Sequence, residues 1–407
     1  MAGVSEQGRR EDGENAPPPS RKRRGTLKGV KEAGYSLVVT LPASKLFGGW
    51  EVRTAKSGCA TRRALRSEGR MRSNGIWLAA ISLLSLVMAV GEGRSQGQAP
   101  VPVAAPQPPA TDTIAPNIPG VVAGGTKVQV LGSNFQGTEG PIGMPDGSLL
   151  FTEMDLNRIT RMDRDGKTST FLENTNGSNG LAFDSRGRLI SAQTAPGKMV
   201  VGVIYPRGSE AVLVDSYEGK PLARPNDLVV DKKGGVYFTT AWINPDQNPP
   251  PPPQPLAVYY ITPAGNTLRI AEGIERPNGI QLSPDEKTLY VNNSNGEYLL
   301  AFDIQADGTV RNRRNFAKYD GVTRTAARVT SGADGLAIDS QGRVYAATRI
   351  GIQVFSAQGQ HLGTIPLSRP PQNLAFAGTD KRTLYVVGRG AAFKVQMLAQ
   401  GYMGRAK

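Results

Sequence analysis

The sequence predicts an all-β protein, a six-bladed β-propeller with a metal site in its central channel. Three observations lead to this prediction: a repeated unit, the length of its period, and an oxygen-bearing side chain at one position of every unit. Each unit opens with a polar residue and a small residue ahead of an apolar strand. The six copies open at Glu139, Asn179, Asn226, Asn278, Asp334 and Gln372, with spacings of 40, 47, 52, 56 and 38 residues. A period of roughly 40–50 residues with about four short strands is typical of propellers.

Tight turns and further strands follow each opening. A turn such as Asp146-Gly147 ends the first strand, and a second strand rich in β-branched and aromatic residues comes next. Such runs between glycine-containing turns are strand signals. The second strands include residues 149–152, 236–239, 289–292, 344–347 and 384–387. Third strands are predicted at residues 158–162, 258–261, 300–303 and 352–355.

One strand predicts how the ring closes. Residues 128–131 precede the first unit and have no hairpin partner of their own. We expect them to lie beside residues 393–395, as the outer strand of the last blade. A ring closed in this way has no long free sheet edge.

The six opening side chains should form one ring, because equivalent residues of the blades lie in a circle around the channel. All six carry a side-chain oxygen and none is apolar. Burying so many polar groups is unfavourable unless something satisfies them. Ca²⁺ takes roughly six to eight oxygens of this kind. The alternative is a water-filled channel in which the amides bond one another without an ion.

Histidine and cysteine are too scarce for several kinds of site. His361 and Cys59 are the single residues of their types. A two-histidine metal centre, an intramolecular disulfide and a cysteine zinc site are therefore excluded, which favours calcium or magnesium over zinc or copper. We expect His361 to have a structural role on an outer strand. We expect aromatic residues of the second strands, Tyr237, Tyr290 and Tyr345, to pack between blades.

The N-terminal part of the chain differs in composition from the rest. Residues 1–70 carry 15 Lys and Arg against 7 Asp and Glu, and we interpret them as a basic leader that is disordered or not translated. Residues 71–99 have the positive start, uncharged run and small residues of a signal peptide, with Met71 as the expected start. Residues 100–122 are predicted to be a Pro-rich, extended linker, and residues 123–400 the propeller.

These segments predict where the protein acts and which partners it lacks. We expect export to the periplasm or the medium, with an N-terminal signal anchor as the alternative. We expect no stable membrane insertion after signal cleavage. Because most of the positive charge belongs to the leader, we also expect no nucleic-acid partner.

Several stretches between residues 125 and 398 carry a family resemblance. They are Glu139-Gly140-Pro141, Arg224-Pro225-Asn226-Asp227-Leu228, Arg276-Pro277-Asn278-Gly279-Ile280, Ser283-Pro284-Asp285, Ala333-Asp334-Gly335-Leu336 and Asn373-Leu374-Ala375-Phe376. Together they resemble the senescence-marker-protein/gluconolactonase/luciferin-regenerating-enzyme-like (SGL) family. The resemblance implies a six-bladed propeller with a divalent metal in the channel, most simply Ca²⁺, with Zn²⁺, Mg²⁺ or Mn²⁺ as alternatives.

The resemblance also implies roles for single residues. Glu139, Asn278 and Asp334 match metal ligands, and Asn226 matches a position that binds metal or substrate. Arg224 matches a substrate-contacting position, and Asp334 a catalytic proton acceptor. We expect Asn179 to line the substrate pocket. Two departures from the family pattern are Thr240, where many members have Asp, and the Pro-rich insertion at residues 244–255, which could alter the pocket.

The chemistry that fits these residues is hydrolysis of a lactone to a hydroxy acid. A metal would polarise the ester carbonyl, Asp334 would take a proton from the attacking water, and Arg224 would hold a polar group of the substrate. Two alternatives remain at this point. One is phosphoester or organophosphate hydrolysis at the same site, and the other is a secreted binding module with structural calcium. The lactone, the native metal and the oligomeric state stay open.

Overall fold

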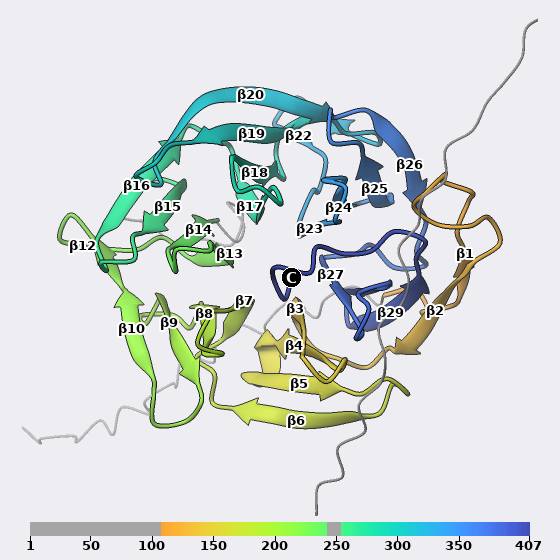
Figure 1. Cartoon of the computed structure of the whole chain (residues 1–407), viewed down its shortest axis with the longest axis horizontal. Coiled ribbons are helices and arrows are strands. Elements are labelled where there is room, and N and C mark those ends of the chain that lie inside the picture. The colour runs from red at the N-terminus through yellow and green to blue at the C-terminus, as the bar shows by residue number, and fades with distance from the viewer. Residues whose placement is uncertain (1–106, 242–253) are drawn as a thin grey trace, which may run out of the picture. The chain divides into compact units, whose positions relative to one another are not determined.

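The structure, a computed structural model, describes residues 107–241 and 254–407. These residues form a propeller of six antiparallel sheets around a central channel (Figure 1). The predicted all-β, six-bladed propeller is therefore confirmed, and the metal site in its channel stays a prediction. The expected basic leader, the signal peptide and most of the Pro-rich insertion at residues 244–255 lie outside the described residues.

The first strand of each sheet is the innermost one, and these inner strands contact one another around the channel. Blade 1 contains β3 (Thr138–Gly143), β4 (Leu149–Glu153), β5 (Arg158–Met162) and β6 (Thr168–Glu173). Blade 2 contains β7 (Ser178–Phe183), β8 (Leu189–Gln193), β9 (Val200–Tyr205) and β10 (Ala211–Val214). Blade 3 contains β13 (Pro225–Val230), β14 (Val236–Thr240), β15 (Ala257–Ile261) and β16 (Thr267–Glu272).

The remaining blades repeat the same order. Blade 4 contains β17 (Pro277–Leu282), β18 (Thr288–Asn293), β19 (Tyr298–Ile304) and β20 (Val310–Lys318). Blade 5 contains β23 (Leu336–Ile338), β24 (Val344–Thr348), β25 (Gly351–Phe355) and β26 (His361–Ile365). Blade 6 contains β27 (Asn373–Ala377), β28 (Thr383–Gly388), β29 (Ala391–Gln396), β2 (Lys127–Gly132) and β1 (Thr113–Ile114). The short 3-10 helix η1 (Met154–Leu156) connects β4 and β5 within blade 1. Short strands between blades are β11 (Ser216–Tyr217), β12 (Lys220–Pro221), β21 (Thr323–Arg324) and β22 (Val329–Thr330).

The ring closes as predicted. β2 pairs with β29 in antiparallel register, with Val128 opposite Val395 and Gln129 opposite Lys394. A strand from before the first blade therefore completes the last blade, and its backbone groups satisfy the edge of β29.

Each pair of neighbouring blades encloses an apolar core. In the core between blades 3 and 4, the ring of Tyr237 stacks on that of Tyr260 with 4.3 Å between centroids. Tyr290 and Tyr345 are buried in the next two interfaces around the ring. The predicted packing role of these second-strand aromatics is confirmed. His361 also has the expected place on β26, the outer strand of blade 5, where its Nδ1 lies 3.1 Å from a carboxylate oxygen of Asp320.

The expectation of an extended, solvated linker is wrong for the end of that segment. Ala115, Ile118, Val121 and Val122 are buried against blades 5 and 6. These apolar residues lie among the prolines, so the segment has enough apolar surface to pack although its composition is typical of a linker.

The packed domain also extends beyond residue 400, the predicted boundary. After β29, residues 397–407 run back to the channel on the side where the inner strands end. The amide of Gly401 donates to the carbonyl of Lys381, and the amide of Gly143 donates to that of Ala406. In Figure 1 the chain reaches the middle of the ring at its C-terminal label. Over the described ranges, no helix has the length and apolar character that a membrane span requires.

Candidate metal and active site

The polar residue that opens each repeated unit is called the ring residue here. In each of the first four blades, a bulge aims this residue into the channel. In blade 1 the register between the first two strands shifts after Glu139, and in blade 4 it shifts between Pro277 and Ile280. Blades 2 and 3 have the same irregularity at the same place. A bulge leaves residues out of the ladder and re-aims their side chains, which is common beside active sites.

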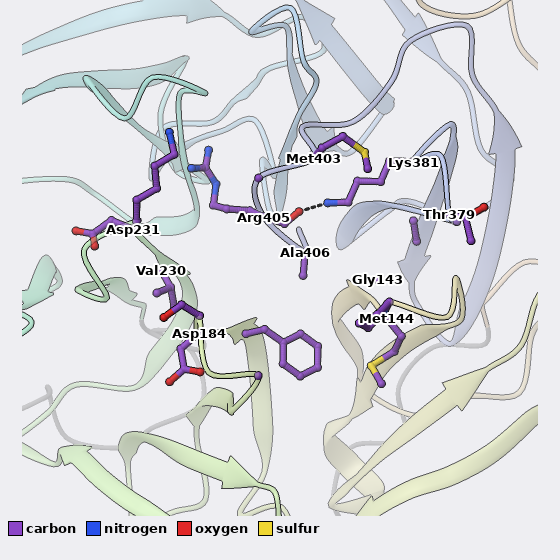
Figure 2. A pocket seen from close by; sticks show the side chains of 18 of the residues that line it. Gly143, Met144, Asp184, Val230, Asp231, Thr379, Lys381, Met403, Arg405 and Ala406 are labelled. Atoms are coloured by element: carbon purple, nitrogen blue, oxygen red, sulfur yellow. Dashed lines mark hydrogen bonds between the residues drawn. The ribbon is translucent and has the colours of Figure 1, made fainter. Parts of the chain in front are cut away.

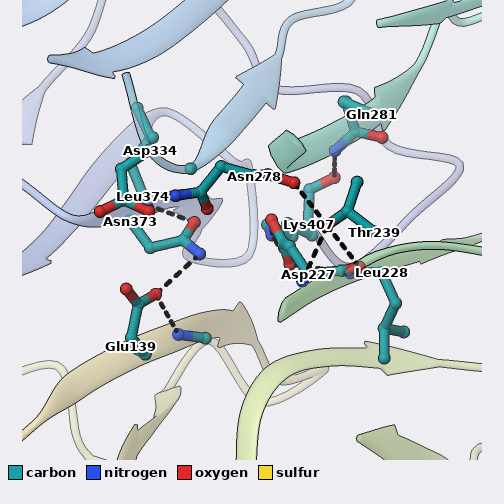
Figure 3. A network of polar contacts seen from close by, with 12 residues as sticks. Glu139, Asp227, Leu228, Thr239, Asn278, Gln281, Asp334, Asn373, Leu374 and Lys407 are labelled. Atoms are coloured by element: carbon teal, nitrogen blue, oxygen red, sulfur yellow. Dashed lines mark hydrogen bonds and ion pairs between the residues drawn. The ribbon is translucent and has the colours of Figure 1, made fainter. Parts of the chain in front are cut away.

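Close packing of the inner strands explains the residue that follows each ring position. A Cβ on Gly140 would lie 2.1 Å from the carbonyl oxygen of Asn179, and one on Gly279 would lie 2.2 Å from that of Asp334. Glycine is therefore required where one inner strand passes over its neighbour. Blades 3 and 6 are the exceptions, because Asp227 and Asn373 occupy this position. Their side chains join the channel network instead (Figure 3).

Glu139 of blade 1 is a buried carboxylate whose hydrogen-bond donors are neutral amides. Its side-chain oxygens accept hydrogen bonds from Nδ2 of Asn373, at 3.2 Å, and from Nε2 of Gln372, at 3.3 Å. Burial, together with the nearby carboxylates of Asp334 and Asp227, raises the pKa of Glu139 to about 8. The amides satisfy its lone pairs but leave its charge without a counter-ion.

Asp334 of blade 5 is a second carboxylate in the same network. Burial raises its pKa to about 6, although the nearby guanidinium groups of Arg276 and Arg389 oppose the shift. The Asn278 amide of blade 4 belongs to this group too, and its Nδ2 donates to Oγ of Ser294 at 3.1 Å. The Asn278 amide oxygen is the acceptor of this side chain and is therefore its atom that can bind a cation.

Asp227 differs from the other two carboxylates because the chain provides a cation for it. Nζ of Lys407 lies 2.6 Å and 2.5 Å from its two carboxylate oxygens, and both side chains are almost fully buried. Nε2 of Gln281 donates to the Lys407 carbonyl at 3.5 Å. The segment 397–407 thus delivers an ammonium group to the channel, and Figure 3 shows Lys407 beside Asp227.

Two arginines lie beside the carboxylates, directly before the inner strands of blades 3 and 4. The side chains of Arg224 and Arg276 are half-buried, and the Nε atom of each is buried without a hydrogen-bond partner. Burial lowers the pKa of Arg224, which Glu139 opposes and Arg276 reinforces.

The structure brings most of the sequence-predicted residues to one place. Glu139, Asn278 and Asp334 converge in the polar network of Figure 3. Asn226 and Asn179 are buried at the corresponding positions of blades 3 and 2, and within the described residues their amide side chains make no hydrogen bond.

Sequence reasoning missed four residues of the site. Asp227, Arg276, Asn373 and Lys407 had no predicted role. A signal for two of them was present, since Asp227 and Asn373 stand where four other blades have glycine. Arg276 repeats the Arg-Pro-Asn pattern of Arg224 one blade further on.

The carboxylate and amide oxygens of this site suit a hard cation, with one restriction on how many carboxylates can bind it. In residues 107–241 and 254–407, no group of three or more His, Cys, Asp or Glu side chains is placed to hold a metal ion. A cation would therefore need amide oxygens beside Glu139 and Asp334. Burial is the largest cause of the raised pKa of both carboxylates, and within the described residues neither forms an ion pair with a lysine or arginine. Carboxylate and asparagine oxygens are ligands that Ca²⁺ accepts, so these residues fit the expected group.

A cavity of about 730 Å³ lies at the other mouth of the channel, where the inner strands end. Met144, Phe183, Lys381 and residues 403–406 are among the groups that line it (Figure 2). Nζ of Lys381 donates to the carbonyls of Tyr402 and Arg405, so its charge holds the tail in place. None of the sequence-predicted site residues lines this cavity, and we place the site at the ring positions.

Comparisons with known proteins show which proteins this chain is similar to. A gluconolactonase from Zymomonas mobilis is 30% identical over 298 residues, which cover 67% of this chain and 82% of that protein. The structure of a gluconolactonase from Xanthomonas campestris matches with a TM-score of 0.62 and 27% identity, over 72% of this chain and 99% of that one. Regucalcin from Agrobacterium tumefaciens, a calcium-binding protein, shares the fold with a TM-score of 0.56 and 17% identity, over 68% of this chain and 95% of that one.

A family model settles the relationship. The SMP-30/gluconolactonase/LRE-like region matches residues 137–389, from just before the first ring residue to the end of the last inner hairpin. This span includes every ring position and both Arg-Pro-Asn stretches. The chain therefore belongs to the SMP-30/gluconolactonase/LRE-like family.

Proposed function

We propose that the protein is a cation-dependent lactonase that hydrolyses a sugar-derived lactone to its hydroxy acid. The observation that carries this proposal is the pair of carboxylates, Glu139 and Asp334, which converge in the channel and form no ion pair among the described residues. Membership of the family and the similarity to two gluconolactonases support the same reaction class.

Glu139, Asn278 and Asp334 would hold the cation, with Asn226 as a further oxygen donor. A bound divalent ion such as Ca²⁺ would supply positive charge opposite the oxyanion that develops on the ester carbonyl. The three donors come from blades 1, 4 and 5, so they can hold an ion only because the ring is closed.

Asp334 is the residue proposed to move the proton. A water oxygen attacks the lactone carbonyl carbon, and Asp334 accepts the proton that this oxygen loses. The ring C–O bond then breaks, and the proton passes to the leaving alkoxide. In the metal-free protein burial raises the pKa of Asp334 to about 6, so this carboxylate is still ionised near neutral pH and can accept a proton.

Arg224 and the two asparagines would position the substrate. The Arg224 guanidinium lies at the start of blade 3 with an unpartnered Nε, and it can donate to a hydroxyl or carboxylate of the bound sugar. Asn226 and Asn179 have free amides in the same part of the channel and would bind ring hydroxyls.

A pH-stat screen of aldonolactones, with and without a chelator, tests the proposal. We expect acid release above the spontaneous rate, loss of this release with chelator, and recovery on addition of Ca²⁺. Acid release that is insensitive to chelator would show that the reaction does not depend on a bound cation. Absence of acid release from every lactone, combined with calcium binding, would favour a binding module. Turnover of phosphoesters but of no lactone would favour a phosphoester hydrolase.

A further inference from the structure

The mouth of the channel is chemically asymmetric. The residue two positions before the ring residue is Gly137, Gly177, Arg224, Arg276, Gly332 and Pro370 in blades 1 to 6. Arginine therefore occurs in blades 3 and 4 alone, whose inner strands β13 and β17 are neighbours. The carboxylates Glu139 and Asp334 belong to blades 1 and 5. A ligand in the channel would meet carboxylates on one side and guanidinium groups on the other.

The two arginines have no structural task that accounts for their charge. Within the described residues neither Arg224 nor Arg276 forms an ion pair, and the one side-chain contact of Arg224 is to Sδ of Met154 at 3.9 Å. A thioether is a weak acceptor. Buried donors are normally satisfied, so two neighbouring Nε atoms without partners indicate a group that is missing.

Arg405 shows what a structural arginine looks like in this protein. Its Nε is also unpartnered, but its terminal nitrogens bind Glu286 at 2.8 Å and the carbonyls of Leu282 and Ser283. Those contacts attach the segment 397–407 to blade 4. Among residues 107–241 and 254–407, Arg224 and Arg276 have no comparable acceptors.

The exposed charges around the mouth balance one another. Arg389 of blade 6 is exposed and near Asp334, and Asp155 is exposed and near Arg224, so water screens the attraction of both. Asp227 does not enter this balance because Lys407 neutralises it. The half-buried guanidinium groups of Arg224 and Arg276 are therefore the charges available to an anion.

We propose that Arg224 and Arg276 together form an oxyanion-binding subsite, and that the substrate is a lactone with a second, negatively charged group. The planar fork of arginine suits a carboxylate, phosphate or sulfonate. This group would sit against blades 3 and 4 while the ester carbonyl faces Glu139 and Asp334. The inference rests on the proposed lactonase function and extends it to a substrate class.

The test compares lactones that differ in charge. kcat/KM is measured by pH-stat for gluconolactone, which is neutral, and for glucarolactone and phosphogluconolactone, which carry a carboxylate and a phosphate. We expect wild-type protein to favour one of the anionic lactones by about 10-fold or more. The difference between the two anionic lactones identifies which oxyanion the subsite prefers.

Variants connect the preference to the subsite. Arg276→Gln should reduce kcat/KM for the preferred anionic lactone about 10-fold more than for gluconolactone, and Arg276→Lys should recover part of the loss. Arg314→Gln removes an exposed arginine on the outer strand β20 and should leave the ratio unchanged. Equal or better turnover of gluconolactone by wild type, with a ratio that Arg276→Gln does not alter, would overturn the inference and leave the lactonase function standing.

A binding measurement decides the case in which no lactone is hydrolysed. Wild-type protein is titrated calorimetrically with glucarate and with phosphogluconate at low and high salt. Binding that weakens with salt and is lost in Arg276→Gln would support the anion subsite although the lactonase function had failed. Absence of binding, or binding that Arg276→Gln does not affect, would overturn the subsite as well.

Discussion

Two groups of buried carboxylates in the same channel are treated differently by the chain. Asp227 receives the ammonium group of Lys407 at 2.5 Å, whereas Glu139 receives amide hydrogen bonds at 3.2 Å and 3.3 Å. Asp334 likewise has no ion pair within the described residues. The chain neutralises one carboxylate with its own cation and leaves the other two without one.

The difference distinguishes Asp227, a carboxylate with a structural role, from Glu139 and Asp334, two carboxylates with a proposed functional role. A buried charge is unfavourable unless it is paired, and an ion pair such as Asp227–Lys407 fixes the tail in the channel. Unpaired buried carboxylates lower stability when they are ionised, and raised pKa values of this kind are typical of functional sites. The comparison therefore indicates that the cation for Glu139 and Asp334 comes from solution.

The largest expected effect is the loss of activity when Asp334, a carboxylate without an ion pair among the described residues, is replaced. Asp334→Asn keeps the shape of the side chain but removes the proton acceptor and one anionic ligand. We expect kcat/KM for the best lactone to fall about 1,000-fold, with an unchanged circular dichroism spectrum. Turnover within a few-fold of wild type would show that another group accepts the proton.

The next largest effect is a loss of stability when the Asp227–Lys407 ion pair is broken. Lys407→Met leaves Asp227 buried without its cation, and we expect the free energy of unfolding to fall by about 3 kcal/mol or more in urea titrations. The double variant Asp227→Asn/Lys407→Met should recover much of this loss, because neither partner is then charged. A double variant as unstable as the single one would show that the ion pair itself is not the cause.

A pH titration of stability distinguishes the two groups further. The pKa of Glu139 is raised from 4.5 to about 8, so between these values the folded protein binds more protons than the unfolded chain. Stability of the metal-free protein should therefore decrease as pH rises through this window. Glu139→Gln should flatten the dependence of Tm on pH, and saturating Ca²⁺ should flatten it in wild type. A slope that Glu139→Gln leaves intact would contradict the assignment.

The smallest effect is expected at an exposed pair. Arg314 contacts Asp303 on the surface of blade 4, where both side chains are more than 40% exposed. Arg314→Gln should change the free energy of unfolding by less than about 1 kcal/mol. A loss as large as that of Lys407→Met would mean that burial does not explain the difference between the ion pairs.

The sequence was sufficient to predict the architecture because the propeller is periodic. The spacing of the ring residues predicted six blades, and an unpaired strand at residues 128–131 predicted the closure that the structure shows. The ring position also led to Glu139, Asn278 and Asp334, since equivalent residues of a closed ring must converge.

Non-periodic features escaped the same reasoning. Lys407 reaches Asp227 across 180 positions of the chain, and no repeat relates them. The Pro-rich residues up to 122 were misinterpreted because composition outweighed the buried apolar residues Ile118, Val121 and Val122. Arg276 belongs to an Arg-Pro-Asn stretch, but its Nε is seen to be buried without a partner among the described residues only when the neighbouring inner strands are in place.

Calorimetric titration of the metal-free protein with Ca²⁺ tests the central claim most directly. The account predicts one bound ion per chain, with an affinity at least about 10-fold lower in Glu139→Gln and in Asp334→Asn, and unchanged in the Arg314→Gln control. Absence of calcium binding in wild type, or equal affinity in wild type and both carboxylate variants, would contradict the claim that these two carboxylates take their cation from solution.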